Sequence, residues 1–589
     1  MDRNSIIAMV LIAIVIILLP YYQKLINGNQ PPKKENVQQV ENKEPEKEKP
    51  EIQTTDESPT SQTKEIESDI DTVKTVKKLN VPVIQDSTEE LTEINTDKIH
   101  VIISNKGGGN LIQFVLLDYD EYDSTKVNMI DTSINNGLTL TFQNNNGDFI
   151  DLDNYLFKER KTGNPNIEPG RQFKIKYTIT IDGNELTKTY IFYDDKYHFD
   201  LVVNFSNPGN MLLNRKYQIG WKNGLPSTEA YTADDYNYSQ TYVYMAESLE
   251  SYSISEPGKK ETEVLSGSAD WLAVRTKYFI SSLIHVNADV SEGVYISGIG
   301  VKKPDYVQRL YDFGYNTQYS GSNDTLRVYI GPLDHSELSY YDNNLDELIM
   351  NNGWYERTFR FISLLILPVL EFLYKIIPNY GIVIIIFSIL IKIIVHPLTK
   401  KSYSSMKEMQ KIQPLMAEIK EKYKDDSQRM NKEMMNLYKQ HGVNPMGGCL
   451  PMLLQMPLLI ALFIVFRSTI ELRGAMFIPG WITDLSRPDT LFTLPFSLPM
   501  YGNEFNLLPI LMSLTMIFQS KMTMQDPKQK AMVYIMPVFM LLIFNRFPSG
   551  LNLYYTMFNL LTIIQQKFIG NSSDKNPKPD TEKKKKQYK

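Results

Sequence analysis

The chain has 589 residues, which is more than one ordinary globular core fills, so several domains or a domain plus a membrane part are expected. Its formal net charge of −6 argues against DNA as a partner, because surfaces that bind phosphate are basic. The single cysteine, Cys449, excludes a disulfide framework and a cysteine-based metal site within one chain.

An apolar segment, Ser5–Tyr22, follows Arg3 near the start of the chain. Its length suits a helix that crosses ~30 Å of hydrocarbon, and no small-residue cleavage site follows it. We therefore expect residues 1–23 to form an uncleaved signal anchor, with a cleaved signal peptide as the alternative. Residues 24–97 are rich in Glu, Lys, Pro, Gln, Thr and Ser, so they bury too little apolar surface to offset ordering entropy. This segment is predicted to be a disordered tether.

Residues 98–350 show the two-residue periodicity of β-strands. Phe173–Ile181 alternates apolar and polar side chains, Asp182–Asn184 forms a turn signal, and Leu186–Tyr193 alternates again. Further short strands are predicted at His100–Ser104, Leu138–Phe142, His198–Phe205 and Leu326–Ile330. The pattern predicts an all-β sandwich of antiparallel sheets. The glycine-rich Lys106–Asn110 lacks the lysine and helix of a phosphate-binding loop, so we interpret it as a turn.

The chain becomes strongly apolar after Trp354. The candidate membrane spans are Tyr380–Pro397, Gly447–Phe466, Asn506–Met522, Ala531–Phe547 and Leu551–Ile569. One further apolar stretch, Thr358–Ile377, carries two basic residues and one acidic residue around a central proline. This composition suits an amphipathic helix in the membrane interface better than a span, so residues 351–379 are assigned to such a helix.

The distribution of basic residues tests the number of spans. With the anchor counted, six spans place Arg3, the lysine-rich loop 398–446 and the basic tail 570–589 on the same side of the membrane, which is the cytoplasmic side. Both termini are then cytoplasmic and the β domain lies outside. The loop 398–446 carries apolar side chains at three- and four-residue intervals in two runs, which predicts an antiparallel helical hairpin. These stripes hold the hairpin together, bind a partner, or do both.

Polar side chains interrupt the apolar spans. Lys392 lies five residues before Pro397, so its stem could reach the cytoplasmic headgroups, or its charge could serve a hydrated cavity. The second reading is favoured by a polar stripe on one face of the last span, at Asn552, Thr556, Asn559 and Gln566, and by Gln455 and Gln519 on two other spans.

The residues that other membrane functions and hydrolytic enzymes require do not occur in the expected places. The apolar cores of the five C-terminal spans contain no acidic residue, which argues against a proton-coupled transporter. No hydrolase motif occurs, so we expect no enzymatic activity, no cofactor and no metal site. A hydrated cavity that carries a cation fits a site that receives polar or acidic peptide segments.

Several stretches strongly resemble the YidC family of membrane-protein insertases. They are His396–Pro414 (HPLTKKSYSSMKEMQKIQP), Asn444–Leu459 (NPMGGCLPMLLQMPLL), Phe547–Tyr555 (FPSGLNLYY) and Asn559–Gln566 (NLLTIIQQ). The anchor and the large β domain resemble the Gram-negative form of the family. The resemblance implies a polytopic α-helical protein of the bacterial inner membrane, with six transmembrane helices, of which five form the insertase core at 380–569. It also implies a periplasmic β domain and a cytoplasmic helical hairpin.

The resemblance also implies a function and a site. A hydrophilic groove, open to cytoplasm and lipid, would insert nascent membrane proteins and help them fold, alone or beside the Sec translocon, and the hairpin and tail would dock the ribosome. The family's groove cation is usually arginine, and here the matching position is Lys392, which keeps the charge but loses the guanidinium fork. The aromatic pair that contacts substrate would be Tyr554 and Tyr555. A small-molecule transporter or channel, or an envelope scaffold, are the alternative functions.

Overall fold

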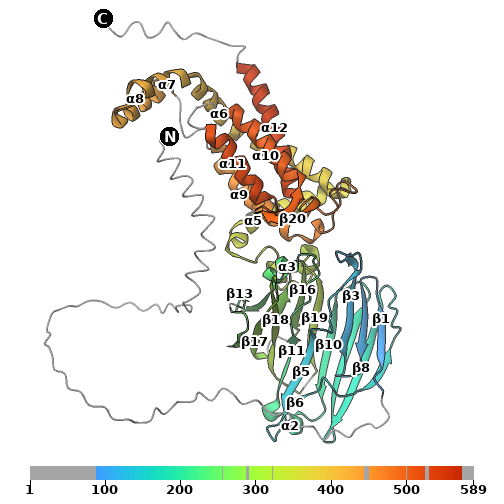
Figure 1. Cartoon of the computed structure of the whole chain (residues 1–589). Coiled ribbons are helices and arrows are strands. Elements are labelled where there is room, and N and C mark those ends of the chain that lie inside the picture. The colour runs from blue at the N-terminus through green and yellow to red at the C-terminus, as the bar shows by residue number, and fades with distance from the viewer. Residues whose placement is uncertain are drawn as a thin grey trace, which may run out of the picture. The chain divides into compact units, whose positions relative to one another are not determined.

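The computed structural model describes residues 88–254, 256–286, 291–321, 323–442, 450–498, 501–523 and 530–573. The predicted anchor, most of the predicted tether and the tail after Ser573 lie outside these residues. The described chain contains a β domain followed by a helical region (Figure 1). This confirms the predicted order of a β-rich part and a helical part.

The β domain is built from strands β1 to β19 with a few short helices between them. The strands are β1 (Leu91–Asn95), β2 (Ile99–Ser104), β3 (Asn110–Asp120), β4 (Lys126–Asn128), β5 (Gly137–Gln143), β6 (Phe149–Asp151), β7 (Lys158–Thr162), β8 (Gln172–Ile181), β9 (Asn184–Tyr193), β10 (His198–Phe205), β11 (Lys216–Lys222), β12 (Gln240–Met245), β13 (Ser248–Tyr252), β14 (Lys260–Ser266), β15 (Trp271–Arg275), β16 (Phe279–His285), β17 (Ser291–Lys302), β18 (Val307–Gln318) and β19 (Asp324–Pro332). The short helices are α2 (Pro208–Met211), η2 (Leu213–Arg215), α3 (Thr232–Tyr238), α4 (His335–Ser339) and η4 (Leu345–Leu348).

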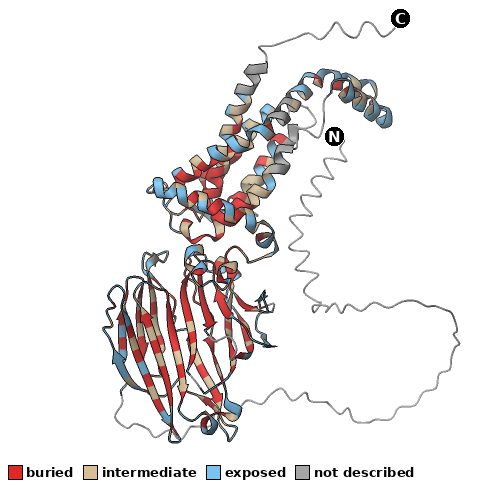
Figure 2. Ribbon diagram, turned by 180° about the vertical axis from the view of Figure 1, so that it is seen from behind, coloured by how far each residue is buried: buried red, intermediate tan, exposed pale blue. Residues whose placement is uncertain are grey.

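These strands form three antiparallel sheets. The largest has nine strands in the order β13-β12-β15-β16-β19-β10-β9-β8-β7, and the others are β14-β17-β18-β11-β5-β6 and β1-β2-β3-β4. The nine-stranded sheet packs against both smaller sheets, since Phe205 on β10 contacts Tyr217 on β11 and Tyr119 on β3 contacts Phe279 on β16. Burial alternates along many of the strands, which appear in Figure 2 as ribbons with red and lighter bands. The predicted antiparallel sandwich is therefore present.

The β8–β9 hairpin shows why the sequence pattern was informative. Ile181 pairs with Asn184 across a two-residue turn, and both turn residues, Asp182 and Gly183, have positive φ (48° and 78°). Asp-Gly is the pair that such a tight turn favours, and alternation on both sides fixes the register.

Strand β1 corrects the predicted tether. It lies inside the range 24–97, and it pairs with β2 while burying Thr92 and Ile94. The prediction of disorder up to residue 97 is therefore wrong for Leu91–Asn95. The strand offers a single large apolar side chain to the core, so its sequence carries little periodicity.

The glycine-rich turn at Lys106–Asn110 holds a buried lysine. Gly107, Gly108 and Gly109 all have positive φ, and the carbonyl of Gly107 accepts a hydrogen bond of 2.9 Å from the Nζ of Lys188 on β9. The hydroxyl of Tyr190 donates to the carbonyl of Gly108 at 3.2 Å. Side chains at these glycines would collide with neighbouring groups, so the turn confirms the structural interpretation of this motif.

This environment makes the stability of the β domain depend on pH. Burial lowers the pKa of Lys188 from 10.5 to about 8. As pH rises through 8, the folded chain releases this proton before the unfolded chain does, so the unfolded state binds more protons and stability rises. Relative to Lys188→Met, we expect the wild type to gain roughly 1 kcal/mol of unfolding free energy between pH 8 and pH 9. Denaturant unfolding of both proteins at both pH values measures the gain, and an unchanged difference contradicts it.

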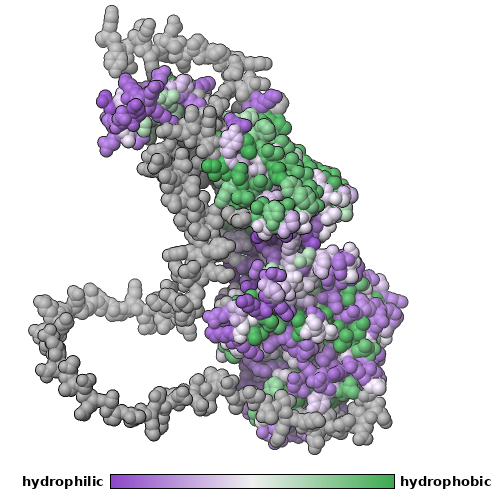
Figure 3. Space-filling model, viewed as in Figure 1, coloured by the Kyte–Doolittle hydropathy of each residue, from purple (hydrophilic) through white to green (hydrophobic). Residues whose placement is uncertain are grey.

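The helical region begins directly after the β domain. Its elements are α5 (Trp354–Ile376), α6 (Tyr380–Lys411), α7 (Gln413–Lys422), α8 (Ser427–Gln440), α9 (Leu450–Ser468), η6 (Ile470–Leu472), a hairpin of β20 (Thr490–Leu498) and β21 (Gly502–Asn506), α10 (Leu507–Thr523), α11 (Lys530–Phe544) and α12 (Ser549–Ser573). In Figure 3 the visible helices beside the α7–α8 pair are mostly hydrophobic, whereas the α7–α8 pair is mostly hydrophilic and the β domain shows a mixed surface.

The helices differ in length from the predicted spans. Among the described residues, Tyr380–Pro397 is the one helical segment both long and apolar enough to cross a membrane. Shorter apolar segments lie at Gln455–Ser468, Leu507–Met522 and Val533–Phe544. Helix α6 also continues through Pro397 to Lys411, so the predicted boundary between span and hairpin falls inside one helix. The six-span topology stays a prediction.

Helices α7 and α8 pack on each other through a small apolar cluster. Ile412, Met416 and Leu437 are buried in it, and the partly buried side chains around them are Met409, Ile419, Met434 and Tyr438. These are the side chains of the predicted stripes, so the stripes hold this pair of helices together.

The segment that follows α9 binds the β domain through charged side chains. Nε of Arg473 lies 2.6 Å from Oε1 of Glu229, both side chains are only 7% exposed, and Nη2 of Arg487 lies 3.2 Å from the other Glu229 oxygen. Arg467, on α9 itself, forms a second ion pair, 2.5 Å from Asp234, and these two side chains are about 30% exposed. The buried Arg473–Glu229 pair and these partly exposed pairs join the β domain to the end of α9 and the segment after it.

Candidate functional site

Lys392 is buried between two helices of the core. It lies on α6, its residue is 8% exposed, and its Nζ donates a hydrogen bond of 2.6 Å to the hydroxyl of Thr562 on α12. The same nitrogen lies 4.2 Å from the ring centre of Phe558, one turn earlier on α12. A hydroxyl and an aromatic face both stabilise an ammonium group without neutralising it. The predicted cation therefore lies inside the helical region, packed against α12.

The first turn of α12 fits closely against the preceding loop. The amides of Ser549 and Gly550 donate to the carbonyls of Arg487 and Leu485, at 2.7 Å and 3.0 Å. A Cβ added at Gly550 would lie 3.2 Å from the Leu485 carbonyl oxygen, which is tight. The free amides at the start of α12 thus find acceptors in the loop, and the absence of a side chain at Gly550 lets the helix approach that loop closely. This docking fixes the position of the polar residues that follow.

The aromatic pair lies where α12 meets α6 and α9. Tyr554 is fully buried, and its hydroxyl accepts a hydrogen bond of 3.3 Å from Nε2 of Gln455 on α9. Its ring contacts Phe387 on α6 and Phe558, with centroids 6.3 Å and 5.9 Å away. Tyr555 meets Tyr554 edge to face at 5.5 Å. The structure therefore brings Gln455, Tyr554 and Tyr555 together, next to the residues that surround Lys392.

Asn559 joins α12 to a different neighbour. Its Nδ2 donates to the hydroxyl of Thr515 on α10 at 3.3 Å and approaches the Met512 carbonyl at 3.5 Å. Gln519 lies one turn after Thr515 on α10 and is partly buried. The polar side chains of α12 are therefore divided between the α6 side, through Thr562, and the α10 side, through Asn559.

Two predicted site residues have local roles in the helices. Asn552 is fully buried, and its Nδ2 donates to the carbonyls of Phe544 and Phe547 at 3.1 Å and 3.4 Å. The hydroxyl of Thr556 donates back to the Asn552 carbonyl at 2.8 Å. Asn552 thus satisfies carbonyls at the end of α11. These contacts therefore give no support for treating Asn552 as a groove residue in the same way as the other residues of the predicted stripe.

Gln566 lies near the far end of α12 and is partly buried, and both atoms of its amide group are enclosed without a hydrogen-bond partner among the residues that the structure describes. The neighbouring Gln565 pairs with Nδ1 of His396 on α6 at 2.5 Å. The α6–α12 contact therefore continues beyond Lys392 toward the ends of both helices.

Thr562 and Phe558 contact Lys392, and neither belongs to the predicted site residues. Phe558 gives no polar signal inside an apolar span, whereas Thr562 is polar and lies near the predicted stripe. The spacing could have pointed to them, because Tyr554, Phe558 and Thr562 follow each other at four-residue steps along one side of α12.

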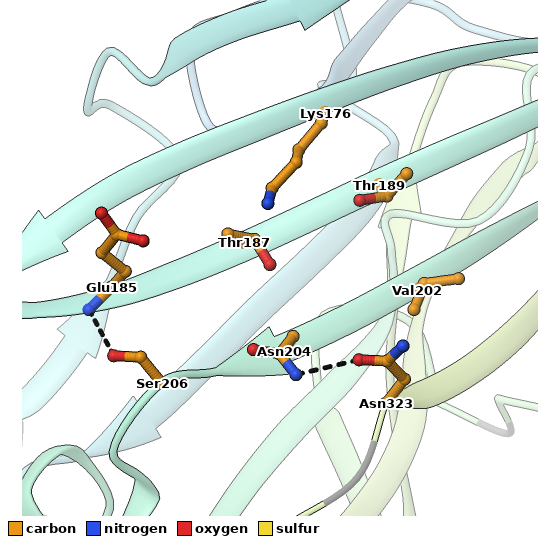
Figure 4. A pocket seen from close by; sticks show the side chains of 8 residues that line it. All are labelled: Lys176, Glu185, Thr187, Thr189, Val202, Asn204, Ser206 and Asn323. Atoms are coloured by element: carbon orange, nitrogen blue, oxygen red, sulfur yellow. Dashed lines mark hydrogen bonds between the residues drawn. The ribbon is translucent and has the colours of Figure 1, made fainter. Parts of the chain in front are cut away.

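The β domain carries a separate polar pocket, with a volume of about 240 Å³ (Figure 4). It lies on β8, β9 and β10, and it is lined by Lys176, Glu185, Thr187, Thr189, Val202, Asn204, Ser206 and Asn323. Asn204 donates to Asn323 at 2.9 Å, and the amide of Glu185 donates to Ser206 at 2.8 Å. Several of its polar groups thus satisfy one another, and none of the predicted site residues lies here.

Comparisons with known proteins cover almost the whole chain. Residues 91–366 match the YidC periplasmic domain family, and residues 372–576 match the 60Kd inner membrane protein family. A membrane protein insertase YidC of Prosthecochloris aestuarii is 34% identical over 98% of this chain and 96% of its own length. The corresponding protein of Chlorobaculum parvum is 34% identical over 97% of this chain and 94% of its own.

A crystal structure of an active YidC insertase with its first transmembrane domain resolved is also similar. It is 17% identical with a TM-score of 0.35, over 84% of this chain and 95% of that one. With the two curated relatives covering nearly all of it, the chain belongs to the YidC family of membrane protein insertases.

Proposed function

We propose that this chain inserts nascent membrane proteins into the bacterial inner membrane and helps them fold. The observation that carries the proposal is Lys392, a cation buried in a lipid-exposed helical region and held by Thr562 and Phe558. Burial of a charge in such a place is costly, so it marks a functional position. The names of the relatives support insertion and give no support to a transporter or a scaffold.

The proposed topology follows from the charge distribution. Six helices span the membrane, both termini and the α7–α8 pair lie in the cytoplasm, and the β domain lies in the periplasm. Helix α5 lies in the periplasmic interface, where its exposed Phe361, Phe372 and Ile376 contact lipid while Leu367 and Leu370 pack inward. The α7–α8 pair and the basic tail receive the ribosome, and the core works alone or beside the Sec translocon.

The proposed mechanism needs no nucleotide and no cofactor. A short polar or acidic segment of the client enters from the cytoplasm and is attracted by the Lys392 charge. Polar side chains, Asn559 and Gln566 on α12 and Gln455 on the neighbouring α9, form hydrogen bonds to the segment in place of part of the water that it loses. This lowers the free-energy cost of moving the segment across the membrane. The apolar helix of the client meanwhile leaves toward lipid, and its transfer from water into hydrocarbon supplies the free energy.

Reconstitution tests this function. The purified full chain, placed in liposomes, should convert a ribosome-released single-span client with a short acidic tail into a protease-protected form, whereas empty liposomes should not. A client that is inserted equally well by liposomes with and without the chain contradicts the proposal. A second client with a neutral tail separates insertion in general from attraction of the acidic tail.

A further inference from the structure

The hairpin β20–β21 projects apolar side chains that no other part of the described chain covers. Leu491, Phe492, Phe496 and Leu498 are 46%, 52%, 58% and 43% exposed. Residues 490–503 contain no charged side chain. The β20–β21 ladder is irregular at Leu491, and from Pro495 to Leu498 exposed residues follow one another along β20 instead of alternating with buried ones, so neither face of this part of the strand is covered within the described chain. Large exposed apolar surfaces of this kind are interaction sites.

The base of the hairpin is held in place by a buried polar network. Asp489 is 2% exposed, and its Oδ2 accepts the amides of Leu507 and Leu508, the first residues of α10, at 3.0 Å and 2.7 Å. Nδ2 of Asn545, at the end of α11, donates to the carbonyls of Tyr501 and Glu504 at 3.0 Å and 2.9 Å. The hairpin is thus fixed to the ends of two apolar helices.

Chain continuity indicates what the apolar surface meets. Strand β21 ends at Asn506 and α10 begins at Leu507, and α10 exposes apolar side chains of its own, Leu511, Leu514 and Phe518. A protein partner would cover one face of the strand, whereas lipid surrounds both. The hairpin has unpaired strand edges whose amides and carbonyls need hydrogen bonds, so it cannot lie in the hydrocarbon core.

We propose that the β20–β21 hairpin inserts into the headgroup region of the bilayer and anchors the end of α10 there, with both faces of β20 in contact with lipid. The proposal uses the membrane location of the family and does not depend on the Lys392 site. It adds a second lipid-contacting element to the interfacial helix α5.

The single cysteine makes a labelling test direct. In a Cys449→Ser background, an environment-sensitive fluorophore is attached to Leu491→Cys, Phe492→Cys or Phe496→Cys, and the full chain is reconstituted in phosphatidylethanolamine–phosphatidylglycerol vesicles. Val264→Cys on β14, 66% exposed and also on a strand, is the matched control. Lipids that carry a quencher at a shallow or a deep acyl position then report contact and depth.

At all three hairpin positions we expect blue-shifted emission, of which the shallow quencher removes about half and the deep quencher removes less. At Val264 we expect no quenching. Emission at the hairpin positions that matches Val264 overturns the proposal. Quenching at only one of the three hairpin positions also overturns it, because side chains that all lie in the headgroup region are all reached by the shallow quencher. Protease resistance of the β domain, compared with wild type, verifies that each labelled variant is folded before it is measured.

Discussion

Lys392→Met is expected to slow insertion of a client with an acidic tail by about tenfold, which corresponds to about 1.4 kcal/mol of lost stabilisation. Methionine keeps an unbranched apolar stem of similar length, so it removes the charge and the hydrogen bond to Thr562 while it largely preserves packing. Lys392→Arg is expected to stay within about threefold of wild type, because it keeps the charge and stacks on Phe558. The protease-protected client in proteoliposomes is the measurement.

A client with a neutral tail is the control for this series. It should be inserted by Lys392→Met almost as well as by wild type, since it carries no charge for Lys392 to attract. Lys392→Ala adds a cavity to the loss of charge, so it shows how much of any defect comes from packing. If Lys392→Met inserts the acidic client at the wild-type rate, the lysine serves only the packing of α6 on α12 through Thr562 and Phe558 and has no role in client binding.

Glu229→Gln is expected to loosen the attachment of the β domain to the helical region by about 3–5 kcal/mol. Glu229 is buried and binds both Arg473 and Arg487, so its neutralisation removes the acidic partner of the buried Arg473, whereas Arg487 keeps its ion pair with Asp484. Hydrogen exchange of the backbone amides at residues 225–235 and 470–490 measures the opening, and those amides should exchange at least ~100-fold faster.

Glu408→Gln is the matched control, because Glu408 and its partner Lys411 are 50% and 58% exposed. That change should cost under ~1 kcal/mol. Arg473→Gln combined with Glu229→Gln should restore part of the loss, since the second change removes one uncompensated charge. Exchange rates that match wild type in Glu229→Gln contradict the inferred role of this ion pair.

The elements with strong periodicity could be predicted from the sequence, and the irregular ones could not. Strands β8 and β9 alternate cleanly around Asp-Gly, so their bounds were nearly right. The β20–β21 hairpin escaped prediction because Pro495 lies within the strand, where proline removes a backbone donor and argues against pairing. It is tolerated here because the ladder is interrupted between Thr493 and Leu498.

The predicted span and the helix that contains it end at different residues. The apolar segment ends at Pro397, as predicted. The helix α6 continues to Lys411, because a proline inside a long helix removes one hydrogen bond without ending it. The sequence shows that a proline disfavours continuation of the helix. Whether the lost hydrogen bond is tolerated depends on how the helix packs against its neighbours, which the sequence does not show.

The candidate site could be predicted as a set of residue types, but not as a set of contacts. Lys392, Gln455 and Asn559 were identifiable because polar side chains are rare in apolar helices. Their partners depend on how α6, α9 and α10 are rotated about α12, and one sequence does not report these rotations. The same limit applies to Asn552, whose stripe position looks like that of Asn559 although it serves the end of α11.

The small cluster between α7 and α8 has a consequence for how the chain unfolds. With Ile412, Met416 and Leu437 as its buried side chains among the described residues, this pair has far less apolar contact than the β domain. We therefore expect its backbone amides to open as a unit of their own, at a lower free energy than the sheets need. We also expect heating to produce at least two separate transitions, which a single melting temperature does not describe.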